Sequence, residues 1–142
     1  MKNIELPNEI LCKIVENRHT RFLAKQNFVF HFNLERTRDV KEVNRKCAFL
    51  TLADKVSVRA FTIAQRVKLL SGGLKDRSTV VKQACGQMMK AWLRSYDQNI
   101  IKLLEAIDTE ASIDCSELML EFLFKGTPKN YKLLFYVLYV MF

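Results

Sequence analysis

The sequence predicts an all-α protein in which pairs of helices stack into an α-solenoid. Three observations lead to this prediction. The 142 residues include only four glycines and two prolines, too few for a sandwich or barrel that needs a turn about every 8 to 12 residues. A short pattern recurs at an interval of 37 residues, a period typical of stacked repeats. Further amphipathic stretches lie between the copies, so each unit is expected to be a helix, a turn and a helix.

The repeated pattern begins with an aspartate. In Asp39 to Cys47 and in Asp76 to Ala84, the aspartate is followed by valine four residues later, a cation six later and a small residue eight later. A weaker third copy starts near Asp114 and carries Leu120 where the cation is expected. The pattern therefore decays toward the C-terminal end of the chain.

Each copy is expected to form a helix, because aspartate at its start accepts hydrogen bonds from free N–H groups and suits the positive end of the helix dipole. The apolar stripes expected to face the core are Val43, Cys47 and Leu50 in the first copy, Val80, Ala84 and Met88 in the second, and Leu118 and Phe122 in the third. Two more helices are predicted, over 62–70 and 97–107. Ser71, Gly72 and Gly73 are expected to end the first of them.

Two cations recur in each repeat, and they are expected to have different roles. Arg45 and Lys82 are expected to pair with the aspartate of a neighbouring repeat, as an internal ladder of charges. Arg38 and Lys75 also recur at 37 residues, immediately before the aspartate and in the turn between helices. These two side chains are expected to be solvated and free to contact a phosphate.

Charge is distributed unevenly along the chain. Residues 34–107 hold fifteen lysines and arginines against seven acids, whereas residues 108–124 hold five acids and no base. The net charge of the whole chain is +8 and hydrophobic residues make up 49% of it, which is typical of a basic globular protein. This charge favours a polyanionic partner and leaves nucleic acid and an acidic membrane both open.

The segments ERTRDVKE (35–42), LADKVSVRAFTIAQRVKLL (52–70), GLKDRSTVVKQA (73–84) and AWLRSYDQNIIKLLEAID (91–108) carry a family resemblance. Residues 34–128 closely resemble the HEAT-repeat region of the condensin G-subunit family. Residues 1–33, expected to be helical, and the apolar tail 129–142 do not resemble it. The domain prediction is therefore an N-terminal segment, a unit of two to three HEAT repeats and a tail of uncertain structure.

The resemblance implies a non-enzymatic subunit of the complex that compacts mitotic chromosomes. In that family the HEAT solenoid holds a segment of the kleisin subunit and grips duplex DNA, while separate SMC subunits hydrolyse ATP. The implied localisation is the nucleus and mitotic chromosomes, and also the cytoplasm. Lysines and arginines on a curved stack of helices would bind phosphates without reading bases.

Eight cations are the candidates for DNA binding, chosen for their nearness to the repeat turns or, more weakly, for lying on the repeat helices. The first group is Arg36, Arg38, Lys41, Lys75 and Arg77, and the second is Lys46, Lys90 and Arg94. Trp92 and Phe61 could stack on bases, but aromatic residues at helical spacing are expected to belong to the core.

Catalytic, metal and cofactor sites are not predicted. The glycine pair does not follow a strand and is not part of a phosphate-binding loop. His19 and His31 lack a partner at a recognised spacing, and Cys12, Cys47, Cys85 and Cys115 form neither a zinc motif nor a disulfide framework. Cys47 and Cys85 are expected to be core thiols. No enzyme activity, cofactor or small-molecule substrate is expected, and the first residues lack an apolar secretory signal, which favours a reducing intracellular compartment.

Two other readings remain beside DNA binding. The chain could be a generic HEAT scaffold whose basic surface binds an acidic or extended peptide. It could also associate with a membrane through residues 130–142, although the apolar run there is shorter than the roughly 20 residues that a spanning helix needs. No membrane partner is therefore expected.

Overall fold

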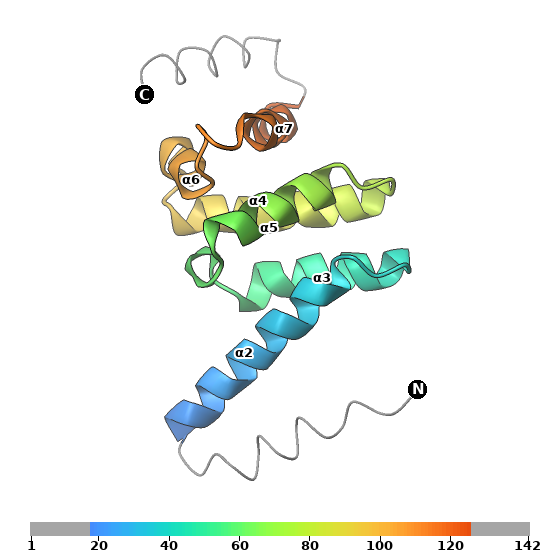
Figure 1. The fold of residues 1–142 in the computed structure, drawn as a ribbon, viewed down its shortest axis with the longest axis vertical. Helices are drawn as coiled ribbons and strands as arrows, with labels where there is room; N and C mark the ends of the chain where they lie inside the picture. Colours follow the sequence, from blue (N-terminus) through green and yellow to red (C-terminus); the bar gives the residue numbers. More distant parts are fainter. Residues whose placement is uncertain (1–17, 126–142) are drawn as a thin grey trace.

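The computed structural model describes residues 18–125, with side chains from residue 27, and all regular secondary structure in this part of the chain is helical (Figure 1). The elements are α2 (Arg18–Arg36), α3 (Glu42–Lys55), a short 3-10 helix η1 (Val58–Ala60), α4 (Ile63–Leu74), α5 (Thr79–Ser95), α6 (Ile100–Ala106) and α7 (Ile113–Leu123). The pairs α2/α3 and α4/α5 stack in chain order, and α6 and α7 lie on the second pair (Figure 1). The predicted all-α stack of helix pairs is confirmed.

The core lies where α3 and α4 pack against α5. Leu52 of α3, Leu70 of α4 and Met88 of α5 are each fully buried. Next to η1, Phe61 lies between the rings of Phe30 and Trp92, with centroid separations of 5.1 Å and 5.4 Å. Both Phe61 and Trp92 are 2% exposed. Their expected role as core residues is confirmed, and base stacking by them is excluded.

The break expected at Ser71–Gly73 does not occur, because α4 continues to Leu74. Gly73 is buried, and a Cβ atom built on it would lie 2.6 Å from Cys85 Cβ and 2.8 Å from Phe49 Cζ. The glycine therefore serves close packing of α4 against its neighbours rather than helix termination. Packing offsets the roughly 1 kcal/mol that glycine costs inside a helix.

The apolar stripe predicted for the first repeat helix is wrong in part. Val43 is 68% exposed, Cys47 is exposed and Leu50 is only half-buried, while the buried face of α3 consists of Arg45, Ala48, Phe49 and Leu52. The buried face of α3, which includes Arg45, therefore lies on the opposite side of the helix from the predicted stripe. In α5 the prediction holds for Ala84 and Met88, but Val80 is 38% exposed.

The two repeat aspartates lie three residues before the first helical residue, and the N-cap positions themselves are Lys41 and Ser78. Asp39 Oδ1 accepts from the Lys41 N–H at 2.8 Å, and Asp76 Oδ1 accepts from the Ser78 N–H at 2.9 Å. Ser78 is the residue that caps α5 directly, because its Oγ accepts from the Val81 N–H. Each aspartate thus accepts a free N–H immediately before its helix, as expected, but it does not occupy the capping position.

The third unit departs from the first two. Asp114 is exposed and lies inside the first turn of α7, whereas Asp39 and Asp76 lie before their helices. The residues of α7 that are buried are Cys115, Ser116, Met119 and Leu120, while Leu118 and Phe122 are half-buried. Helix α7 packs on α4.

The predicted helix over 97–107 is present only from Ile100, because Asp97 and Gln98 have positive φ angles.

The domain boundaries drawn from the sequence stay predictions. The boundary at 33/34 falls inside α2, which runs through it without a break. The tail 129–142, and with it the membrane hypothesis, lies outside the described residues. Within the described residues, no helix has the length and apolarity that a membrane span requires.

Candidate nucleic-acid interface

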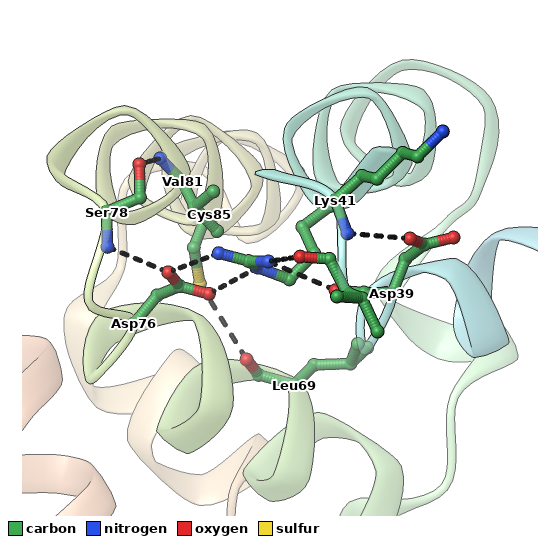
Figure 2. A network of polar contacts seen from close by, with 9 residues as sticks. Asp39, Lys41, Leu69, Asp76, Ser78, Val81 and Cys85 are labelled. Carbon is green, nitrogen blue, oxygen red and sulfur yellow. Dashed lines mark hydrogen bonds and ion pairs between the residues drawn. The ribbon is translucent and has the colours of Figure 1, made fainter. Parts of the chain in front are cut away.

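The two repeat turns, which carry Asp39 and Asp76 (Figure 2), are tied together by Arg45 of the first repeat. Arg45 Nε donates to Asp76 Oδ2 at 2.9 Å and Arg45 Nη2 donates to Asp76 Oδ1 at 3.1 Å. The same guanidinium donates through Nη1 to the carbonyl oxygens of Asp39 and Val40, each at 3.0 Å. Arg45 is only 6% exposed. This bidentate contact joins the α2–α3 turn to the α4–α5 turn, as the ladder prediction requires.

The ladder does not extend to the second repeat in the described part of the chain. Lys82 occupies the position equivalent to Arg45 and is half-buried, but no ion pair is formed by it with a described residue. The counterpart aspartate of the third copy, Asp114, has moved into α7. The ladder is therefore confirmed for Arg45 and not for Lys82.

The pKa of Asp76 reflects this contact. Burial alone would raise the pKa of Asp76, but the hydrogen bonds from Arg45 and from the Ser78 N–H outweigh it and hold the pKa below its ordinary value of 3.8. The carboxylate consequently stabilises the fold at any pH above about 4, where both the folded and the unfolded states are ionised. This stabilisation is lost as the pH falls through the lowered pKa of the folded state.

We expect Asp76→Asn to be less stable than the original chain at pH 5 to 7, and we expect the difference to shrink as the pH falls from about 4 to about 2. Urea unfolding at a series of pH values measures this difference. Asp54→Asn, which changes an exposed carboxylate at the end of α3, is the control and should show a much smaller difference. A stability difference for Asp76→Asn that is the same at pH 2 and pH 6 would contradict the assignment.

The predicted turn cations lie together on one edge of the stack. Arg38 and Lys41 belong to the α2–α3 turn, Lys75 and Arg77 belong to the α4–α5 turn, and all four are exposed. Arg45 holds the two turns against each other, and we call the exposed surface of these joined turns the turn edge. Arg36 lies nearby as the last residue of α2, with its guanidinium 4.7 Å from the centre of the Phe32 ring.

The three weaker candidates are exposed but lie on helices. Lys46 is on α3, in the second turn of the helix and close to the turn edge. Lys90 and Arg94 lie one helical turn apart near the end of α5, where Lys90 Nζ is 5.8 Å from the centre of the Phe122 ring. The 17 residues of α5 span about 25 Å. The structure therefore does not bring Lys90 and Arg94 to the turn edge.

Two cations of α4 were missed by the sequence analysis. Lys68 is exposed, and its spacing of seven residues from Lys75, two helical turns, is a signal that could have found it. Arg66 is structural, because its side chain donates to the Val58 carbonyl at 3.0 Å and to the Ala106 carbonyl at 2.7 Å. No sequence signal distinguishes this arginine from a surface charge.

A groove of about 570 Å³ opens beside the turn edge, between the end of α2 and α4. Its lining includes the side chains of Arg38, Lys68 and Lys75, together with the Arg45–Asp76 pair and the apolar residues Leu34, Phe49 and Leu69. Two of the predicted DNA-binding residues, Arg38 and Lys75, thus line a concave site.

The remaining reactive groups do not form a catalytic or metal centre among the described residues. Burial raises the pKa of the Cys85 and Cys115 thiols and keeps them protonated. The expectation of a core thiol is confirmed for Cys85 and wrong for Cys47, which is exposed. His31 is exposed and its ring contacts Phe30 edge-on. In residues 18–125 no group of three or more histidine, cysteine or acidic residues could hold a metal ion.

Stacked antiparallel helix pairs, with an arginine of one pair bound to the turn aspartate of the next, define an α-solenoid of the HEAT type. The comparison with solved structures agrees with this class. The crystal structure of the Schizosaccharomyces pombe condensin Cnd3–Cnd2 subcomplex superposes with a TM-score of 0.67 at 29% identity, over 87% of this chain and 18% of the matched chain. No protein-family model matches the sequence.

Curated relatives identify the subunit. The chain is 49% identical over 94 residues to human condensin complex subunit 3 and 35% identical over 97 residues to the Schizosaccharomyces pombe protein of the same name. These matches cover 66% and 67% of this chain but only 9% and 11% of the relatives. The matched part of the chain is thus a segment of the condensin complex subunit 3 type, and it spans about a tenth of the length of those proteins.

Proposed function

We propose that this HEAT segment binds duplex DNA through phosphate contacts at the turn edge, as part of a non-catalytic condensin subunit in chromosome condensation. The observation that carries the proposal is the clustering of Arg38, Lys41, Lys75 and Arg77 on turns joined by Arg45. Exposed cations held on a fixed edge attract phosphates without reading base sequence. Lys46 and Arg36 extend this surface, while Lys90 and Arg94 would contact a separate stretch of backbone.

The partners implied by the family are part of the same proposal. A matched chain is solved in a Cnd3–Cnd2 subcomplex, which supports binding of a second condensin subunit by this type of solenoid. We propose that the segment holds part of the kleisin and acts beside SMC subunits, in the nucleus, on mitotic chromosomes and in the cytoplasm. The chemistry of ATP hydrolysis would belong to those other subunits.

We expect the double variant Lys41→Glu, Arg77→Glu to bind duplex DNA at least about tenfold more weakly than the original chain, with a salt slope lowered by about two. Both residues are exposed and lie outside the groove lining, so the fold and the groove should be unaffected. Fluorescence anisotropy of a labelled duplex, titrated at several salt concentrations, measures both quantities.

The matched control is Lys102→Glu, Lys125→Glu, which makes the same charge change at two exposed positions of the C-terminal part. Its salt slope should stay near that of the original chain. Equal losses of affinity in the two double variants would show that only net charge matters, and the assignment of the turn edge would be wrong.

A protein scaffold without DNA binding is the second candidate, and the opposite end of the stack favours it. Asp108, Glu110, Asp114 and Glu117 around α6 and α7 are all exposed, and such a surface repels phosphates. Binding of a kleisin peptide by a chain that does not bind duplex DNA would favour this candidate.

A further inference from the structure

The groove between α2 and α4 differs from the rest of the turn edge in its chemistry. Three of its lining cations, Arg38, Lys68 and Lys75, are exposed, while the charge of Arg45 is matched by Asp76. The lining therefore carries a net charge of +3 at neutral pH. Its apolar lining is the half-buried Leu34, with Phe49 and Leu69, only 2% and 5% exposed, at the floor. An apolar wall with a few convergent charges is typical of a site that takes side chains rather than a phosphate backbone.

Gly72 is a second and independent observation about this groove. It lies inside α4, where glycine costs roughly 1 kcal/mol relative to alanine, and a Cβ built on it would meet nothing within 4 Å. The packing that explains Gly73 is thus absent at Gly72. Gly72 lines the groove, so its missing side chain keeps one wall open and lets a ligand approach the backbone of α4.

We propose that this groove is a docking site for a peptide segment of a partner protein, in which acidic residues flank an apolar side chain. The acids would pair with Arg38, Lys68 and Lys75, and the apolar side chain would pack against Leu34 over the floor of the groove. The volume of about 570 Å³ lies within the roughly 300–1,000 Å³ that is typical of ligand-binding clefts. This site is distinct from the DNA surface, although Arg38 and Lys75 lie on the border of both.

The test uses the full 142-residue chain and fluorescein-labelled peptides of twelve residues, made of Asp, Glu and Ser with a central Phe-Leu pair. A second peptide carries Ser in place of the pair and keeps the same charge. We expect the first peptide to bind saturably and more tightly than the second. Gly72→Leu should weaken its binding at least about tenfold, because leucine fills the groove without changing any charge.

Gln87→Leu is the matched control, since it adds the same side chain at an exposed position of α5 outside the groove lining. This variant should bind the peptide like the original chain. A further pair keeps the test valid if Gly72→Leu does not fold by circular dichroism: Lys68→Glu should weaken peptide binding more than Lys102→Glu, which makes the same charge change on α6.

Duplex DNA in parallel titrations separates this proposal from the proposed function. Gly72→Leu should keep the DNA affinity of the original chain, whatever that affinity is. Absence of saturable peptide binding, or equal binding by Gly72→Leu and the original chain, would overturn the docking site and leave the turn-edge proposal untouched. Loss of DNA binding in Gly72→Leu would also overturn it, because the groove would then be a nucleic-acid site.

Discussion

Gly73→Ala is expected to destabilise the fold by about 2 to 3 kcal/mol, whereas Gly72→Ala, one residue earlier in α4, is expected to stabilise it by about 0.5 to 1 kcal/mol. The added methyl group at Gly73 would overlap the buried Cys85 side chain and lie 2.8 Å from Phe49 Cζ. Both neighbours belong to the core between α3 and α5, so neither can move without displacing a helix.

At Gly72 the same methyl group meets open space, and only the gain in helix propensity remains. The two variants make the same substitution at adjacent positions of α4. Their changes in the free energy of unfolding are nevertheless expected to have opposite signs. Urea unfolding followed by circular dichroism measures both free energies of unfolding. Similar destabilisation by both substitutions would contradict the packing described for α4.

Arg45→Ala is expected to lower the melting temperature by about 10 °C or more, because three acceptors lose their hydrogen bonds from the guanidinium at once. It leaves the Asp76 carboxylate without its ion pair and the carbonyl groups of Asp39 and Val40 without their donor. Arg45→Lys should recover only part of this loss, since a single ammonium cannot reproduce the bidentate fork.

Lys82→Ala is the matched control for the ladder. Lys82 stands at the equivalent position of the second repeat, and it forms no ion pair with a described residue. Its replacement should change the melting temperature by no more than about 2 °C. Thermal unfolding of the three variants checks the account, and an equal loss for Lys82→Ala and Arg45→Ala would refute the difference between the repeats.

The architecture was predictable because the 37-residue repeat survives in the two units that fold regularly. Asp39 and Asp76 indicated where α3 and α5 begin. The 37-residue interval between the repeats also predicted that Arg45 pairs with the aspartate of the next repeat. The rotation of α3 was not predictable, because Val43 and Cys47 have the apolar character of core residues and yet are exposed. The buried face is the one that carries Ala48, Phe49 and Leu52 together with Arg45, and it packs on α5.

The cations were predictable as exposed residues, but not as members of one site. The repeat placed Lys75 in a turn and Lys90 on a helix, but no local sequence feature showed which of these cations share a groove. The groove escaped prediction for the same reason, because it joins Leu34 of α2 with Lys68 and Gly72 of α4. The two adjacent glycines predicted a helix end. In the structure, close packing explains Gly73 and the groove explains Gly72.

The central claim is that the turn edge binds duplex DNA through its phosphates, and a salt series on the unmodified chain tests it most directly. A labelled duplex is titrated with the 142-residue chain at several salt concentrations, with far-UV circular dichroism on the same sample. We predict that the logarithm of the binding constant falls linearly with the logarithm of salt concentration, with a slope of about −3 to −5 for the turn-edge cations. A helical sample that does not bind DNA, or binds it with no salt dependence, would contradict the claim.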